Sequence, residues 1–130
     1  MSDTQGNSDQ IEFWNGVHGE SWARNTDILD FMFAELTAAI LDEASVGVGD
    51  RVLDLGCGGG GTTLEIARRV TAIGSVTAID VSGPMIEVAR RRAQDAGLTN
   101  AAFVMGDAAA YPFEEATYDA LVSRLGCMFF

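Results

Sequence analysis

The chain of 130 residues contains no lysine, so its positive charge comes from eight arginines alone. Nineteen acidic side chains outweigh them and give a formal net charge of −11. A protein that binds nucleic acid needs a basic surface that releases counterions from the phosphate backbone. Anionic membrane surfaces attract basic segments for a similar reason. We therefore expect no nucleic-acid partner and no membrane insertion.

Cysteine and long apolar segments are also scarce. Cys57 and Cys127 belong to no CxxC or Cys/His cluster, which excludes a disulfide framework and a zinc signature, so no metal site is expected. No apolar run approaches the roughly 20 residues that span a bilayer. The polar N-terminus has neither the basic nor the apolar segment of a secretory signal. These absences predict a cytoplasmic protein.

Acidic residues are concentrated in the first part of the chain. Residues 1–50 hold ten Asp or Glu against one Arg, a net charge of −9, whereas residues 51–130 hold nine against seven, a net charge of −2. We interpret the acidic part as solvated surface. Residues 1–9 are expected to be a disordered N-terminus, residues 10–46 a helical cap and residues 47–130 a single α/β domain.

An amphipathic helix is predicted over residues 26–45. Asn25 or Thr26 can cap it, and Asp27 suits the positive end of its dipole. Apolar side chains recur at helical spacing and are expected to face a core: Ile28, Met32, Leu36, Ala39 and Ile40.

Short apolar strands alternate with helices in the rest of the chain. Strands are predicted over residues 51–55, 75–79, 101–105 and 118–123. Helices are predicted over residues 62–70 and from the Ser82 cap to residue 96, where Gly97 ends the second one. This order predicts an α/β, Rossmann-like fold with a mainly parallel sheet and right-handed crossovers.

The segment VLDLGCGGGG, residues 52–61, is the strongest motif and can be parsed in two ways. One is the dinucleotide fingerprint GxGxxG, with Gly61 as its last glycine. The other is Asp54 followed by alternating glycines at Gly56, Gly58 and Gly60. Both let the backbone turn sharply after a strand and approach a ligand. A carboxylate at Asp54 is a poor neighbour for pyrophosphate and a good one for ammonium, so it favours a nucleoside that carries an amino acid.

Two further carboxylates follow later strands. Asp80 ends the second strand, 80 − 56 = 24 residues after the first loop glycine, where it can accept hydrogen bonds from both hydroxyls of a ribose. Asp107 follows the third strand and can accept from an adenine amino group. Because ligands of open α/β sheets bind beyond the carboxyl ends of the strands, we expect Asp54, Asp80 and Asp107 to contact amine, ribose and base in turn.

The chain resembles the class I S-adenosylmethionine-dependent methyltransferase family, especially its small-molecule branch related to ubiquinone- and menaquinone-biosynthesis methyltransferases. The resemblance covers about residues 48–125 and rests on DRVLDLGCGGGGTT (50–63), TAIDVSGPMIEVARRRA (77–93) and VMGDAAAYPFEEATYDALVSR (104–124). The segment FWNGVHGESWARN (13–25) is similar to a leader found in some bacterial members. The resemblance implies S-adenosylmethionine as cofactor and a small organic molecule as methyl acceptor.

The resemblance also implies which residues bind each part of the cofactor. The methionine part would be held by Asp54 and the loop of Gly56, Cys57, Gly58 and Gly60; the ribose by Asp80; the adenine by Val81, Met85, Asp107 and Ala108; and Ser123 would line the channel of the methyl donor.

No catalytic residue is identified. Methyl transfer is an in-line displacement that depends on proximity and orientation, and it needs a base only when the acceptor must lose a proton. His18, the sole histidine, is a conceivable base and otherwise an ordinary surface residue. Trp14 and Trp22 are either a cap over the cofactor or plain core or surface aromatics.

The family sheet has seven strands in the order 3-2-1-4-5-7-6, whereas this chain ends just past the fourth. The fourth strand would then be an open edge followed by the apolar segment LGCMFF (125–130), which predicts self-association. Two alternatives stay open: an NAD(P)-binding oxidoreductase, and a truncated module that binds the cofactor without turnover.

Overall fold

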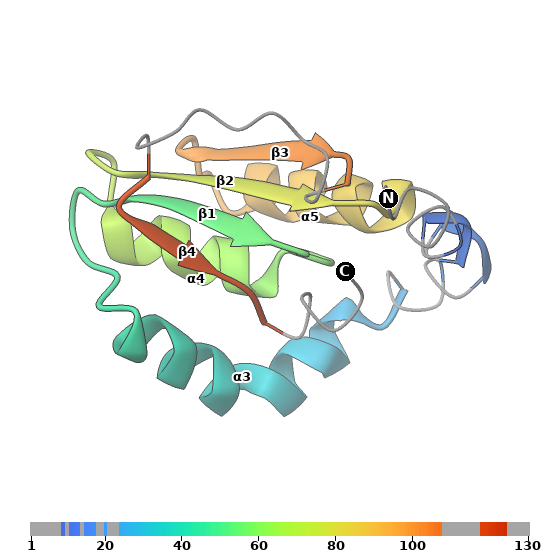
Figure 1. The fold of residues 1–130 in the computed structure, drawn as a ribbon, viewed down its shortest axis with the longest axis horizontal. Helices are drawn as coiled ribbons and strands as arrows, with labels where there is room; N and C mark the ends of the chain where they lie inside the picture. The colour runs from blue at the N-terminus through green and yellow to red at the C-terminus, as the bar shows by residue number, and fades with distance from the viewer. Residues whose placement is uncertain are drawn as a thin grey trace, which may run out of the picture.

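The computed structural model describes residues 9, 11–13, 15–17, 20, 24–107 and 118–124. Their regular elements follow the chain in this order: α3 (Thr26–Glu43), β1 (Arg51–Leu55), α4 (Gly61–Val70), β2 (Ser75–Asp80), α5 (Gly83–Asp95), β3 (Ala101–Met105) and β4 (Ala120–Val122) (Figure 1).

The four strands form one sheet in the order β3-β2-β1-β4, and every neighbouring pair is parallel. Helices α4 and α5 cover one face of this sheet, and α3 packs beside α4 (Figure 1). In the register, Asp54 of β1 lies opposite Ala78 of β2 and Val122 of β4. The α/β, Rossmann-like fold with a parallel sheet is confirmed.

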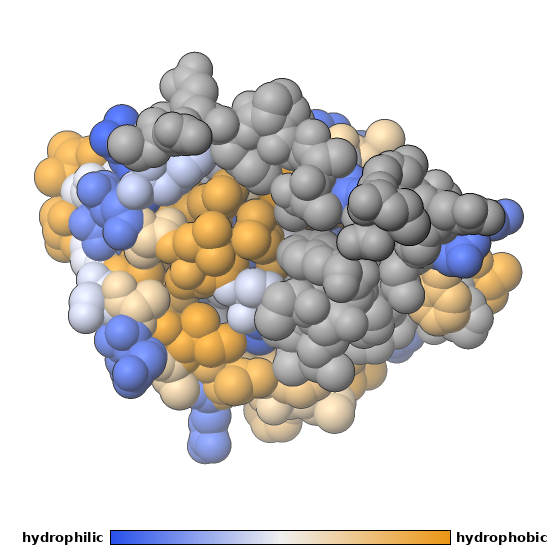
Figure 2. Space-filling view, viewed as in Figure 1, coloured by the Kyte–Doolittle hydropathy of each residue, from blue (hydrophilic) through white to orange (hydrophobic). Residues whose placement is uncertain are grey.

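The main hydrophobic core lies between the sheet, α4 and the end of α3. Its members are almost fully buried aliphatic side chains: Leu41, Val46, Val52, Ile66, Ala67, Val70, Val76 and Val122. On the view of Figure 2, apolar side chains also gather over β1 and β4, where Leu121 is 60% exposed. Because β4 pairs with β1 alone among the described residues, this strand is an edge of the sheet.

The predicted apolar stripe on α3 is wrong except at Ile40, which is partly buried and packs against the main core. Ile28 and Met32 are 61% and 65% exposed, whereas Thr37 and Leu41 are buried. Asp30 on the inner side of α3 pairs with Arg92 and Arg124, and these pairs, together with the burial of Leu41 in the core, favour the observed rotation of the helix. Asn25 stands at the N-cap position without a side-chain capping hydrogen bond.

The element boundaries agree with the predictions to within a few residues. Ser82 caps α5, with its hydroxyl accepting from the backbone N–H of Met85 at 3.4 Å. Gly97 follows α5 with a φ of +70°, the left-handed conformation expected after a helix. β4 is shorter than the predicted strand 118–123, because only Ala120–Val122 pair with β1.

Several predictions fall on residues outside the described part of the chain: the first eight residues, Trp14, His18, Trp22, Ala108, Cys127 and the segment 125–130. Among the described helices, none combines the length and apolarity that crossing a membrane requires.

Candidate functional site

The glycine-rich loop between β1 and α4 distinguishes the two parses of its motif. Gly56, Gly58 and Gly60 have φ values of +68°, +57° and +90°, a region that L side chains rarely adopt. The backbone N–H groups of Gly56 and Cys57 both donate to the Ile79 carbonyl, at 2.8 and 3.0 Å, which ties the loop to the end of β2. The left-handed residues are thus the three alternating glycines that follow Asp54.

Gly61 is required for another reason. It is the first residue of α4, and a Cβ atom added to it would collide with the carboxylate of Asp30 from α3. Nothing in the spacing of the motif indicated this neighbour, because Asp30 lies 31 residues earlier in the sequence (61 − 30 = 31). The fourth glycine therefore accommodates a side chain of the protein itself.

Asp54 is the most unusual ionisable group of the site. It is fully buried at the carboxyl end of β1, and its Oδ2 accepts a 2.7 Å hydrogen bond from the Thr63 hydroxyl. Its Oδ1 has no partner among the described residues. Burial raises the pKa of Asp54 to about 7, against the opposing influence of the Thr63 hydrogen bond and the Arg124 charge; Asp80 adds a smaller upward contribution. A buried oxygen without a hydrogen-bond partner destabilises the folded protein unless a ligand donates a hydrogen bond to it.

Asp80 connects the loop to the start of α5. Its Oδ2 accepts from the Gly58 N–H and its Oδ1 from the Ser82 N–H, both at 2.8 Å. Burial raises the pKa of Asp80, while hydrogen bonds from the backbone N–H groups of Ser82, Gly58 and Val81 lower it in part. A carboxylate has about four lone-pair sites, so each oxygen retains capacity for a ligand hydroxyl.

Two further predicted site residues, Asp107 and Ser123, follow the ends of β3 and β4. The Gly106 N–H, directly before Asp107, donates to the Asp80 carbonyl at 2.9 Å, so the ends of β2 and β3 are tied together. Ser123 directly follows Val122, the β4 partner of Asp54. The structure thus brings the ends of all four strands to one edge of the sheet.

The side chains of Met85 from α5 and Cys57 from the loop itself are buried at this site. The Met85 methyl group would lie 3.1 Å from a Cβ at Gly58. Cys57 is buried with Ala78 and Ile86, and burial, assisted by the charges of Asp54 and Asp80, raises the pKa of its thiol well above the usual range. A neutral buried thiol acts here as a packing residue.

Several side chains that the motif analysis missed support the loop and its neighbours: Asn15, Asp30, Thr63, Arg92 and Arg124. The Asn15 amide donates to the Val81 carbonyl at 2.6 Å and accepts from the Gly83 N–H at 2.8 Å, which anchors the N-terminal segment to the start of α5. Thr63 could have been identified from the sequence, because a hydroxyl in the first turn of a helix can reach an acidic residue at the end of the preceding strand. The arginine contacts join distant parts of the sequence and could not have been identified in this way.

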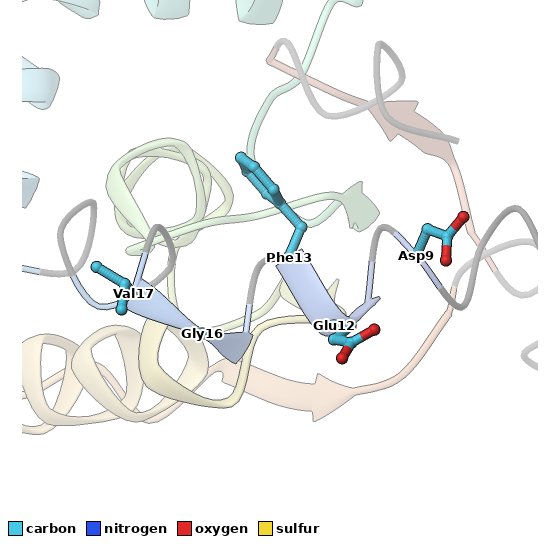
Figure 3. A pocket seen from close by; sticks show the side chains of 5 residues that line it. All are labelled: Asp9, Glu12, Phe13, Gly16 and Val17. Carbon is cyan, nitrogen blue, oxygen red and sulfur yellow. The ribbon is translucent and has the colours of Figure 1, made fainter.

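The N-terminal segment also lines a surface hollow of about 460 Å³. Its lining residues are Asp9, Glu12, Phe13, Gly16 and Val17; the two carboxylates lie towards one end and Val17 at the other (Figure 3). None of these residues belongs to the glycine loop or to the strand ends. The described residues contain no cluster of three His, Cys, Asp or Glu side chains that could hold a metal ion.

Comparisons with known proteins agree with this geometry. Residues 52–130 match the family described as Methyltransferase domain. Aklanonic acid methyltransferase of Streptomyces sp. (strain C5) is 32% identical over 97 residues, which are 75% of this chain and 44% of that protein. Demethylmenaquinone methyltransferase of Staphylococcus aureus is 28% identical over 127 residues, 97% of this chain and 52% of that protein. The chain thus spans about half the length of the curated relatives it matches.

A solved structure of a SAM-dependent methyltransferase from Aquifex aeolicus has a similar fold. It superposes with a TM-score of 0.61 at 28% identity, over 67% of this chain and 46% of that one.

Proposed function

The chain belongs to the Methyltransferase domain family, and on that premise we propose that it binds S-adenosylmethionine and takes part in methyl transfer to a small organic acceptor. The relatives named for aklanonic acid and demethylmenaquinone support a small organic acceptor. The free thiol of Cys57 suits a reducing compartment, and we assign the protein to the cytoplasm.

The observation that carries the proposal is the unpartnered Oδ1 of Asp54. A fully buried carboxylate oxygen at the end of β1 is completed by an ammonium group, which the methionine part of S-adenosylmethionine possesses and a dinucleotide pyrophosphate lacks. The left-handed Gly56, Gly58 and Gly60 favour the same ligand, since they match the parse that begins with Asp54. Neither the site nor the family match supports the NAD(P)-binding oxidoreductase alternative.

The residues of this chain would hold and orient the cofactor. Asp54 would pair with the ammonium, Asp80 would accept from the ribose hydroxyls, and Asp107 would accept from the adenine amino group. The bound cofactor supplies a methyl group on a positively charged sulfur. The contribution of the protein to such an in-line displacement is chiefly proximity and orientation. We also propose that β4, which is an edge strand among the described residues, supports self-association.

Calorimetry tests the proposal on the chain as it stands. We expect S-adenosylmethionine and S-adenosylhomocysteine to bind and NADH not to bind. Asp80→Ala is expected to weaken the binding of both adenosyl ligands at least about tenfold, which corresponds to about 1.4 kcal/mol of binding free energy. Asp119→Ala is the matched control, because the Asp119 carboxylate accepts from the Arg51 N–H at the opposite end of β1. NADH binding without adenosyl binding would overturn the proposal.

A further inference from the structure

The carboxylate of Asp30 joins three elements that are distant in the sequence. It lies on the inner side of α3, with its side chain 23% exposed, and pairs with Arg92 of α5. Its Oδ1 also lies 3.5 Å from Nη2 of Arg124, which follows β4. Both arginines are largely buried, with side-chain exposures of 24% and 14%. This cluster is therefore better shielded from solvent than an ordinary surface ion pair.

Arg92 connects the cluster of Asp30, Arg92 and Arg124 to the glycine loop. Its Nη1 donates a 2.7 Å hydrogen bond to the Gly59 carbonyl. Ala89, one helical turn earlier on α5, packs against the neighbouring loop residue, since its Cβ lies 2.9 Å from the place of a Cβ at Gly60. One face of α5 thus holds the loop by a polar and an apolar contact.

Asp30 itself contacts the loop at Gly61. Its carboxylate fills the space that a side chain at Gly61 would occupy. The guanidinium of Arg92 thus contacts the loop at Gly59 and the carboxylate of Asp30 contacts it at Gly61, and these two groups are paired with each other.

Arg124 fixes the position of α3 in this arrangement. Its Nη1 donates to the Thr37 hydroxyl at 2.8 Å, and its guanidinium lies 5.5 Å from the centre of the Phe33 ring. Asp30, Phe33 and Thr37 follow one another at helical spacing on α3, so a single arginine contacts successive turns of one helix face.

We propose that Asp30 is a positioning residue which, through Arg92, holds the glycine loop in the conformation that receives the methionine part of the cofactor. The inference rests on the proposed function. Its physical basis is preorganisation: a run of four glycines has many accessible backbone conformations, and ordering them on binding reduces affinity. A loop already held at Gly59 and Gly61 loses less conformational freedom when the ligand arrives.

Two ligands that share the adenosine part and differ in the amino-acid part test this role. S-adenosylhomocysteine carries the amino-acid part, whereas 5′-methylthioadenosine has the same adenosine and lacks it. We expect Asp30→Asn to weaken the binding of S-adenosylhomocysteine about tenfold and to keep the affinity for 5′-methylthioadenosine within about twofold of the wild type. A merely structural role would weaken both ligands alike, because both require the folded sheet and Asp80.

The matched control is Asp42→Asn. Asp42 lies on the same helix and pairs with Arg69 at 2.8 Å, away from the loop, so both affinities should stay unchanged. Arg92→Gln breaks the same contacts from α5 and should reproduce the selective loss, which keeps the test usable if Asp30→Asn fails to fold. The variant that combines Asp30→Asn with Arg92→Gln should lose less binding free energy for S-adenosylhomocysteine than the sum of the two single variants, because the two residues are coupled.

The outcomes separate the two proposals. Wild-type protein that binds neither ligand would overturn the proposed function. The positioning role alone would be overturned if the wild type binds S-adenosylhomocysteine and the variants lose affinity for both ligands equally or for neither.

Discussion

Replacing Asp54 by asparagine should stabilise the protein without ligand, by an amount that grows with pH. Asp54 is fully buried, and burial raises its pKa from 3.8 to about 7. Each pKa unit corresponds to about 1.4 kcal/mol, so a charged Asp54 costs the folded state about 4 kcal/mol at pH values above 7. Asparagine keeps the shape and an oxygen for the Thr63 hydroxyl and carries no charge.

The sign follows from proton binding in the two states. Between pH 3.8 and about 7 the folded protein retains a proton on Asp54 that the unfolded chain has lost. The stability that this proton contributes is fully present below pH 3.8 and is lost as the pH rises through the folded-state pKa of about 7. The asparagine side chain does not titrate, so the advantage of Asp54→Asn should increase across this window. From about pH 5.5 to about pH 8.5 the expected increase is about 2 kcal/mol.

Urea unfolding at the two pH values and constant ionic strength measures the effect. Asp42→Asn removes the same charge from a carboxylate that is 72% exposed and serves as the control. If the free energies of unfolding of Asp54→Asn and Asp42→Asn, each relative to the wild type, changed in parallel with pH, the assignment of a destabilising buried charge to Asp54 would be refuted. The same Asp54→Asn variant should bind S-adenosylhomocysteine at least about tenfold more weakly, since it lacks the charge that attracts the ammonium.

Three further results are expected. The affinity of the wild type for S-adenosylhomocysteine should fall by up to about tenfold per pH unit below about pH 7, because protonation of Asp54 competes with the ligand; calorimetry across pH would show a flat profile if it does not. Gly61→Ala should lower the urea unfolding midpoint through the collision with Asp30, and an added Asp30→Ala should raise it again by relieving that collision; a double variant no more stable than Gly61→Ala would contradict this. Ile66→Ala should lower the free energy of unfolding by about 3 kcal/mol, since Ile66 is fully buried in the main core; a loss below about 1 kcal/mol in urea titrations would place it outside that core.

The sheet was predictable from the sequence because its signals are local. The strands over 51–55 and 101–105 are short apolar runs bounded by polar or glycine residues, and each lies where predicted. The Ser82 cap and the Gly97 stop depend on backbone geometry within a few residues. The carboxylates Asp54 and Asp80 were identified from their places at strand ends, and the structure places both there.

The orientation of α3 was not predictable in the same way. Hydrophobic spacing selected the stripe of Ile28 and Met32, which is exposed, because periodicity weighs apolar side chains and ignores long-range ion pairs. The inner face instead carries Asp30, whose partners Arg92 and Arg124 lie 62 and 94 residues later in the chain. The same long-range contact explains Gly61, whose role neither parse of the glycine motif contained.

The strand order β3-β2-β1-β4 has a geometric consequence for where ligands can bind. The chain leaves β1 towards β2 and β3 on one side and returns to β4 on the other, so β1 is the topological switch point of the sheet. Loops that leave adjacent strands in opposite directions open a crevice at that point. The place of the proposed cofactor site is therefore a property of the backbone path, and under the proposed function substitutions in the surrounding loops would change the acceptor without moving that place.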